Sequence, residues 1–280
     1  MWGIVASFER RADGDAELTE VWSRAVGRLT VRRGVPAPLA RAVVANALAV
    51  IHFGELSDLE LLDRLVREFG GRQVAELQDE GLRVVDGPDR PLTTALAQAL
   101  GHHAWGLEPA PAGGVDLTAR PDLVTACAEA GIWLMCVGAA DPEPPVLTTV
   151  EDVLAVFRDG GVPAWRALVA ASRAEPWSGV SEEHLKLLDP VAHAAEVSCL
   201  RAVSEMIRRI VEDEERAAIA AHIRNAIAET GLTQREFASL VGTSSSRLST
   251  YVTGTVTPSA AMLLRINRAA RRVRRGDTAD

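Results

Sequence analysis

The sequence is poor in several residue types, and each shortage excludes a class of protein. Its three cysteines, Cys127, Cys136 and Cys199, are odd in number and widely spaced, which fits neither a disulfide framework nor a zinc site. We therefore expect small buried thiols in a reducing compartment. The longest apolar run, 126–140, is interrupted by Glu129 and is shorter than the roughly 20 residues that cross a bilayer.

The sequence also shows no targeting signal that we can identify. The apolar opening, 1–8, has no basic segment before it and is followed directly by the charged residues 9–11. We expect a cytoplasmic protein with no membrane partner. Lys186 is the single lysine, and the abundance of arginine, alanine and valine beside it is typical of a GC-rich bacterial genome.

Patterns that indicate catalysis are missing too. There is no phosphate-binding glycine loop with a lysine, no G-x-S-x-G nucleophile elbow and no recognisable pair of nucleophile and base. His102 and His103 are adjacent, and adjacent helical residues point about 100° apart, so the two rings are poorly placed to hold one metal ion. We expect no catalytic residues, no metal site and no cofactor.

Strand-like alternation is scarce, and most segments have apolar residues at helical spacing. The segment 82–85 is the best candidate for a short strand. Breakers cluster at 107–114 and 141–145, and the first cluster is a candidate subdomain boundary. The predicted class is mainly α. The predicted helices of the first part of the chain cover residues 18–29, 38–53, 58–69, 72–80, 92–100, 121–137, 149–158 and 163–173.

Charge is divided unevenly along the chain, whose net charge is -8. Residues 216–280 contain ten arginines and four acidic residues, a net charge of +6, so the preceding residues carry -14. An acidic body with a basic end is expected when one module meets a polyanion and the rest does not.

A helix without Gly or Pro is predicted from residue 191 to about residue 216. Leu200, Val203, Ile207 and Ile210 form one apolar stripe on it. The stripe either packs on its own domain or joins two copies of the chain, so a homodimer stays open. The predicted organisation is a helical body at 1–190, a connecting helix at 191–215 that is the candidate dimerisation element, a DNA-binding domain at 216–273 and a tail at 274–280.

The most informative residues begin at Gly231. Thr233 followed three residues later by Glu236 is a capping box, so a helix is predicted to start at Gln234. Gly242 and Gly254 suit the left-handed turns that end helices, and Ser244 suits the start of a helix that runs to about residue 253. Thr257 and Pro258 are the predicted cap and first residue of a further helix, and the isoleucines at 219, 223 and 227 form one face of a helix upstream.

This order of helices resembles the Xre/Cro-type, lambda-repressor-like helix-turn-helix family over residues 217–272, about a fifth of the chain. The resemblance implies a domain of four or five helices in which helix 234–240 crosses the DNA backbone and helix 244–253 enters the major groove. Family members often pair an arginine and a glutamate where this chain has Ile227 and Val252. Because replacing both partners of a buried ion pair by apolar residues is often neutral or stabilising, we predict that these two side chains touch. The residues that carry the resemblance are 231–234, 236–238, 241–242, 244, 248–249, 251, 254 and 258–259.

The resemblance also implies which residues meet double-stranded DNA. Arg247 is the one candidate that can bind guanine O6 and N7 with a bidentate fork, whereas hydroxyls fit many bases. Tyr251 is expected in the core or at its rim. The predicted base contacts are Ser245, Ser246, Arg247, Ser249 and Thr250. The predicted phosphate contacts are Gln234, Arg235, Thr243, Ser244, Thr255 and Thr257.

The function predicted from the sequence is a sequence-specific transcriptional regulator whose body oligomerises or senses an effector or partner. The alternative is an antitoxin or defence-system protein that grips another protein through its body and autoregulates through its DNA-binding domain. An enzyme with an appended DNA-targeting module is a third hypothesis. A co-purifying partner would favour the second, and a deep pocket with convergent polar groups the third.

Overall fold

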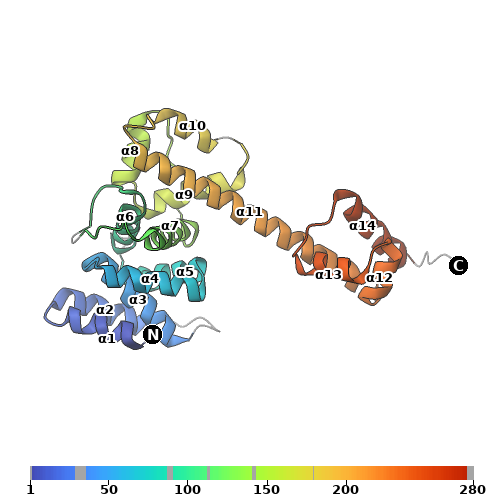
Figure 1. Cartoon of the computed structure of the whole chain (residues 1–280), viewed down its shortest axis with the longest axis horizontal. Coiled ribbons are helices and arrows are strands. Elements are labelled where there is room, and N and C mark those ends of the chain that lie inside the picture. Colours follow the sequence, from blue (N-terminus) through green and yellow to red (C-terminus); the bar gives the residue numbers. More distant parts are fainter. Residues whose placement is uncertain are drawn as a thin grey trace. The chain divides into compact units, whose positions relative to one another are not determined.

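The computed structural model describes residues 2–28, 36–86, 91–111, 114–140, 143–178 and 180–275. Within these ranges the fold has helices and turns but no strand, so the predicted mainly α class is confirmed. The chain forms two compact units, Met1–Ile207 and Arg208–Asp280, which we describe separately (Figure 1).

The first unit, the body, contains ten helices and the start of an eleventh among its described residues. They are α1 (Trp2–Ala12), α2 (Ala16–Arg28), α3 (Ala37–His52), α4 (Leu56–Phe69), α5 (Gly71–Arg83), α6 (Pro91–Trp105), α7 (Pro121–Cys136), α8 (Val150–Asp159), α9 (Gly161–Ala174), α10 (Val180–Leu187) and α11 (Ala194–Ala228). The second unit contains the end of α11 and then α12 (Gln234–Val241), α13 (Ser245–Thr253) and α14 (Ala260–Arg274).

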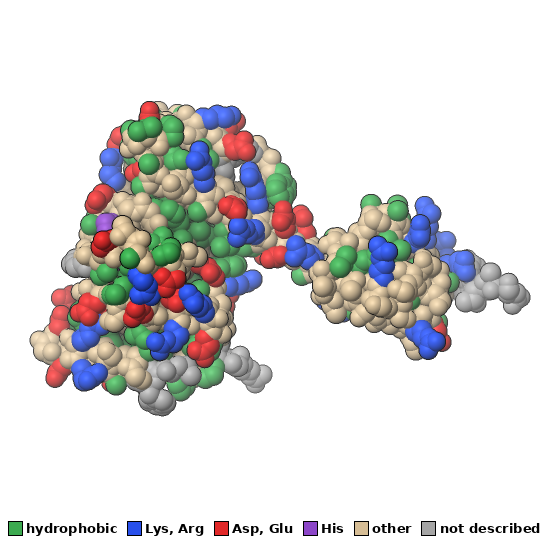
Figure 2. All heavy atoms as spheres, viewed as in Figure 1, with side chains coloured by type: hydrophobic (Ala, Val, Ile, Leu, Met, Phe, Trp, Pro, Cys, Tyr) green, Lys and Arg blue, Asp and Glu red, His purple; other side chains and the backbone are tan. Residues whose placement is uncertain are grey.

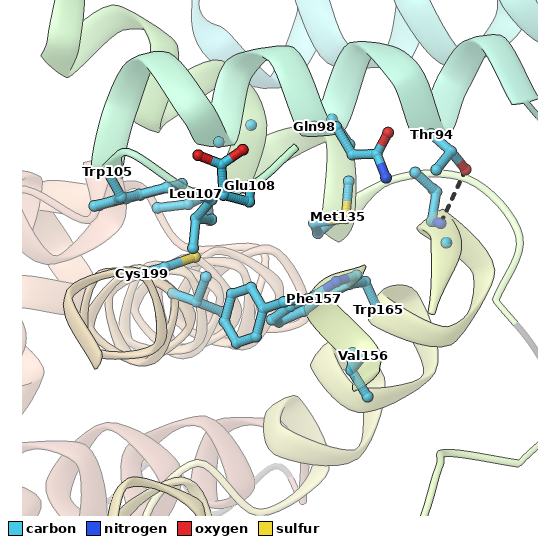
Figure 3. A pocket seen from close by; sticks show the side chains of 17 residues that line it. Thr94, Gln98, Trp105, Leu107, Glu108, Met135, Val156, Phe157, Trp165 and Cys199 are labelled. Carbon is cyan, nitrogen blue, oxygen red and sulfur yellow. Dashed lines mark hydrogen bonds between the residues drawn. The ribbon is translucent and has the colours of Figure 1, made fainter. Parts of the chain in front are cut away.

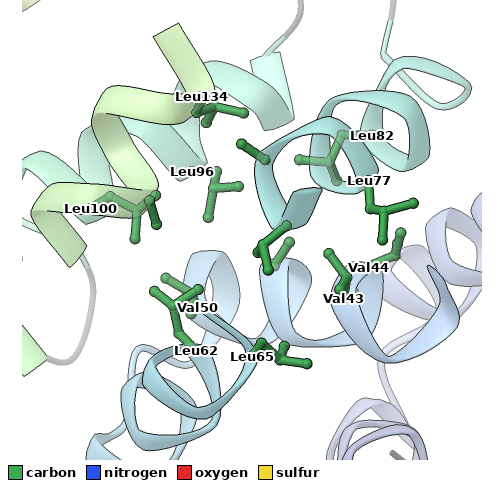
Figure 4. Packing of buried hydrophobic residues seen from close by; sticks show 14 of the residues in the cluster. Val43, Val44, Val50, Leu62, Leu65, Leu77, Leu82, Leu96, Leu100 and Leu134 are labelled. Atoms are coloured by element: carbon green, nitrogen blue, oxygen red, sulfur yellow. The ribbon is translucent and has the colours of Figure 1, made fainter. Parts of the chain in front are cut away.

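Helix α3 is the centre of the body because most of its circumference is apolar and buried, and its buried Asn46 donates to the Asp58 carbonyl at 2.8 Å. Its residues 42–45 and 47–50 are all buried, and α1, α4, α5 and α6 pack around it. Val43, Val44 and Val50 meet leucines of the surrounding helices, including Leu62 and Leu82 (Figure 4). Helix α7 packs on α4, α5 and α6 and continues this core.

A buried ion pair fixes α9 against α5 and α7. Arg166 is 2 % exposed, and its Nη2 lies 2.9 Å from Oδ1 of Asp79. The same guanidinium donates through Nε and Nη2 to the Leu134 carbonyl at 3.1 and 3.0 Å. A Cβ at Gly138, whose φ is 82°, would lie 2.5 Å from Arg166 Nη1. Only glycine suits both this backbone conformation and this close approach.

The segment 82–85, predicted as a strand, is not one. Leu82 and Arg83 form the last residues of α5, and Val84 is its C-cap. The prediction was wrong because a short apolar run has the same composition in a strand and at the end of a buried helix. Helices α1 and α10 were not predicted at all.

Helix α11 runs from Ala194 to Ala228 without interruption, so it includes most of the predicted connecting helix 191–215 and the first helix of the DNA-binding domain. The compact units divide at Ile207 and Arg208. Three residues of the predicted stripe pack within the body, Val203 and Ile207 in its main core and Leu200 against a smaller one. Most of the stripe is therefore used inside one chain, and self-association through it stays a prediction.

No helix among the described residues is both long and apolar enough to span a membrane. The tail residues 276–280 lie outside the described part of the chain, as does Leu29 at the end of one predicted helix.

Candidate nucleic-acid interface

The second unit has its own small core, which fixes the positions of its helices. Phe237 of α12, Leu248 of α13 and Ile266 of α14 are completely buried beside Ile223 of α11. Ile227 and Val252 are half-buried against this same cluster, as expected of two apolar residues that replace an ion pair. Their direct contact stays a prediction.

Helix α12 begins and ends as its residues predict. The Thr233 hydroxyl accepts a hydrogen bond from Glu236 N, and the Glu236 carboxylate accepts one from Thr233 N at 2.8 Å. Hydrogen bonds from the Thr233 hydroxyl and backbone to Glu236 lower the pKa of that carboxyl. Gly242 ends the helix in the left-handed conformation, with φ 72° and ψ 43°.

Helix α13 follows after a short turn. The Ser244 hydroxyl accepts from Arg247 N at 3.1 Å, which satisfies one of the free N–H groups at the helix start. Gly254 ends the helix with φ 76°. Gln234 Nε2 at the start of α12 lies 3.4 Å from the Ser245 carbonyl oxygen, so the starts of the two helices are close together.

The predicted start of the next helix was displaced by two residues. Helix α14 begins at Ala260, and its N-cap is Ser259, whose hydroxyl accepts from Met262 N at 3.3 Å. Thr257 is exposed, and Pro258 is buried before the helix instead of occupying its first position. Both Thr257 and Ser259 are suitable cap residues, and burial of the proline ring decided between them.

The predicted base contacts lie on α13. Ser245, Ser246, Arg247 and Ser249 are exposed, whereas Thr250 is half-buried and donates its hydroxyl to the Arg247 carbonyl at 2.8 Å. The four exposed side chains lie in the first half of the helix, which is the part that recognition helices present to base edges. Of these five residues, Thr250 is the least suited to contact a base, because its only hydroxyl proton is engaged.

Arg247 has a partner that the sequence reasoning did not identify. Its Nε donates to the hydroxyl of Tyr251, 2.9 Å away and one turn later in α13. Tyr251 is 3 % exposed and belongs to the small core, as expected, so its hydroxyl is a fixed anchor. Because Nε is engaged, the two Nη groups are left for other acceptors. The spacing of arginine and tyrosine at i and i+4 on one helix was the available signal.

The predicted phosphate contacts occupy the ends of α12 and α13. Arg235 and Ser244 are exposed, and Gln234 and Thr243 are half-buried beside them. The Ser244 oxygen accepts from Arg247 N, so its proton remains free to donate. At the other end of α13, Thr255 is exposed and its hydroxyl pairs with that of Thr253 at 2.8 Å, while the exposed Thr257 lies beyond it.

Two further arginines have structural partners. Arg224 of α11 donates through Nη1 to the Val252 carbonyl at 2.6 Å and so satisfies a carbonyl in the last turn of α13. Nη1 of Arg274 lies 2.9 Å from Oε2 of Glu229, and this carboxylate partly neutralises the charge of Arg274. Neither pairing has a sequence signal, since both join residues that are far apart in the chain.

Basic side chains gather near the end of the second unit (Figure 2). The body in the same view shows acidic and basic side chains mixed. The exposed arginines of α14 are Arg265, Arg268, Arg271, Arg272 and Arg274, and Arg275 directly after the helix is exposed as well.

The two adjacent histidines of the body differ in their surroundings. His102 Nδ1 lies 2.9 Å from the Leu107 carbonyl oxygen. His103 is buried, and burial lowers the pKa of its ring. Among the residues that the structure describes, no group of three or more His, Cys, Asp or Glu side chains lies close enough to hold a metal ion.

Comparison with known proteins gives a match for the second unit alone. Residues 223–272 match the model of a helix-turn-helix family, which confirms the resemblance to Xre and lambda repressor drawn from the C-terminal residues. No curated protein and no solved structure gives a significant match to the chain. The C-terminal region is therefore a helix-turn-helix domain, and the first 222 residues have no recognised family.

Proposed function

We propose that the protein is a sequence-specific transcriptional regulator in which α13 enters the major groove of double-stranded DNA. The observation that carries this proposal is the hydrogen bond from Arg247 Nε to the buried Tyr251 hydroxyl. It holds the guanidinium at the start of an exposed helix face and leaves both Nη groups available for guanine O6 and N7. Ser245, Ser246 and Ser249 complete this face.

The phosphate contacts are proposed at the helix ends that flank this face. Arg235 supplies a charge, and Gln234, Thr243, Ser244, Thr255 and Thr257 supply hydrogen-bond donors. Such contacts set the register of the protein on the duplex without reading its sequence. The exposed arginines of α14 add attraction that does not depend on sequence.

The role proposed for the body is oligomerisation or the sensing of an effector or partner. Separately from the body, the second unit supports a contact between copies, because its apolar side chains Val256 and Leu264 are 46 % and 55 % exposed. A homodimer would read two half-sites about one helical turn, roughly 34 Å, apart. Light scattering of the full chain at several concentrations distinguishes a monomer from a dimer.

The test of DNA reading is selection of genomic fragments by the purified full chain, followed by titration of the preferred site. Arg247→Ala is expected to weaken binding to that site by about 5- to 150-fold. This factor is equivalent to the roughly 1–3 kcal/mol that a bidentate base contact contributes. Arg268→Ala removes the same charge from α14 and is expected to weaken binding to all DNA sequences by the same factor. Wild-type binding of equal strength to every sequence would exclude a sequence-specific regulator.

The alternative function is an antitoxin or defence-system partner whose body binds another protein. The observation that favours it is the exposed Trp177, with 59 % of its surface accessible on the acidic body. Purification of the chain from its native cells distinguishes the two functions. A stoichiometric protein that stays bound to a Trp177→Ala variant would remove this support, whereas loss of that protein would strengthen it.

A further inference from the structure

The body contains a cavity, open to solvent on one side, that neither the fold nor DNA binding requires. Residues of α6, α7, α8, α9 and α11 line it, together with the loop that follows α6 (Figure 3). Its volume is about 70 Å³. This is about half of the roughly 150 Å³ of an engineered apolar cavity that binds benzene, so a single ring fits here only if it also uses adjoining space.

The walls of the cavity are apolar and partly aromatic. Ile132, Met135 and Val203 lie beside the rings of Trp105, Phe157 and Trp165, and they are joined by Ala97, Leu107, Val156 and Val162. Phe157 and Trp165 form an edge-to-face pair with ring centroids 4.8 Å apart. This pair also lines a second cavity of about 280 Å³, which gives the first one a wall of two rings and room behind it.

Few polar groups reach this space, and one of them is unused. Thr94 Oγ1 accepts from Val162 N at 3.3 Å, so it closes a wall of the cavity. Gln98 extends from α6 toward Phe157 and Trp165 (Figure 3), and its amide has no hydrogen-bond partner among the residues that the structure describes. A half-buried amide without a partner is a ready donor and acceptor for a ligand.

The charge at the rim is negative. Glu108 is exposed and lines the cavity, and its Oε2 accepts from Ala110 N at 2.8 Å, which leaves Oε1 available. Among the residues that the structure describes, no Lys, Arg or His lines the cavity. Cys199 adds no charge, because burial raises the pKa of its thiol. An anion would therefore meet repulsion at this cavity, whereas a cation would find a carboxylate and aromatic faces.

We propose that this cavity binds a small primary amine carried on a single aromatic ring. The ring lies among Met135, Phe157 and Trp165, and the ammonium group lies at the rim, where Glu108 accepts one of its protons and Gln98 another. This inference deepens the effector-sensing role proposed for the body and rests on it.

The test is isothermal titration of the full chain, without DNA, with three probes that share one ring. They are 2-phenylethylamine, the neutral 2-phenylethanol and the anionic 3-phenylpropionate. The amine is expected to bind saturably and about fivefold more tightly than the alcohol, the factor that an ion pair at a solvent-facing rim contributes. The carboxylate is expected not to bind.

Three variants make the result specific to this cavity. Glu108→Gln removes the charge from an exposed position and should abolish the preference for the amine. Ala97→Leu fills the space and should weaken binding of the amine by at least about tenfold. Glu175→Gln changes an exposed glutamate that does not line the cavity and should leave binding unchanged.

Absence of heat with the wild-type chain, equal affinity for all three probes, or amine binding that survives Ala97→Leu would each overturn the proposal. Circular dichroism establishes that the variants remain folded, and Glu108→Gln keeps the test valid if the leucine variant does not fold. A chain that selects DNA but does not bind the amine would overturn this inference alone. Loss of DNA selection leaves the titration result standing.

Discussion

At the scale of single residues, the organisation of the proposed DNA-reading face depends on which hydrogen-bonding groups are already engaged. Thr250 and Ser244 look alike in the sequence, yet the Thr250 proton is engaged by a carbonyl whereas Ser244 uses only its oxygen as an acceptor. Arg247 is committed at Nε alone. A side chain held by one fixed partner loses less rotamer freedom when it binds DNA, which is why Tyr251 should contribute to specificity without touching a base.

This role of Tyr251 can be measured with Tyr251→Phe, which removes the hydroxyl and keeps the ring in the core. We expect discrimination between the preferred site and a site with one altered G·C pair to fall by about three- to tenfold, the worth of one hydrogen bond. Binding to unrelated DNA should not change. In an Arg247→Ala background the same substitution should have no further effect, and an equal loss in both backgrounds would rule out coupling of the two residues.

At the scale of helices, the caps decide where each element begins. Thr233, Ser244 and Ser259 all have extended backbone and accept from the N–H of the third helical residue. Capping-box spacing predicted Thr233 as a cap from the sequence. Ser244 was predicted as a cap because it lies just after Gly242, which suits the end of the preceding helix. The third was misplaced because Thr257-Pro258 and Ser259 are competing signals for the same helix.

The corrected start of α14 gives a direct prediction. Ser259→Ala should lower the free energy of unfolding of the second unit by about 1 kcal/mol, because it leaves the Met262 N–H without its cap. Thr257→Ala is the matched control and should change stability by less than about 0.5 kcal/mol, as a surface substitution does. Urea unfolding monitored by circular dichroism measures both. A larger loss of stability from the Thr257→Ala variant would support Thr257 as the cap of α14, as predicted from the sequence.

At the scale of the whole molecule, the two units differ in charge and in whether a known protein family matches them. The helix-turn-helix unit is basic and matches a family over 50 of its residues, 223–272. The acidic body buries a large core around α3 and a buried ion pair between Arg166 and Asp79. It also contains three histidines with altered ionisation. Desolvation by burial lowers the pKa of His52, His103 and His184.

These histidines predict that the body loses stability in mild acid. Each has a folded-state pKa below its ordinary value, so as the pH falls below about 6.5 the unfolded chain takes up protons first. Their contribution is complete above that pH and is lost as the pH falls toward the folded-state pKa. The melting temperature of the body should therefore fall between pH 7.5 and 5.5, by roughly 2–4 °C for each kcal/mol lost in a domain of this size.

Scanning calorimetry of the full chain at a series of pH values measures this fall. His103→Phe removes one buried imidazole and should reduce the fall in melting temperature between pH 7.5 and 5.5. The fall is measured from the variant's own melting temperature at pH 7.5. A melting temperature that is constant over this range would show that the burial of these rings has no effect on ionisation.

The sequence by itself determined the helical class, the helix-turn-helix domain, the caps Thr233 and Ser244 and the set of side chains proposed to meet DNA. Each of these depends on local patterns, because helical periodicity and capping involve residues only three or four positions apart. Only the tertiary structure decided that Arg166 pairs with Asp79 inside the body, that Pro258 is buried ahead of α14, and that five helices of the body line a cavity. These features arise from the packing of residues that are distant in the chain, and no local pattern encodes which distant side chains will meet.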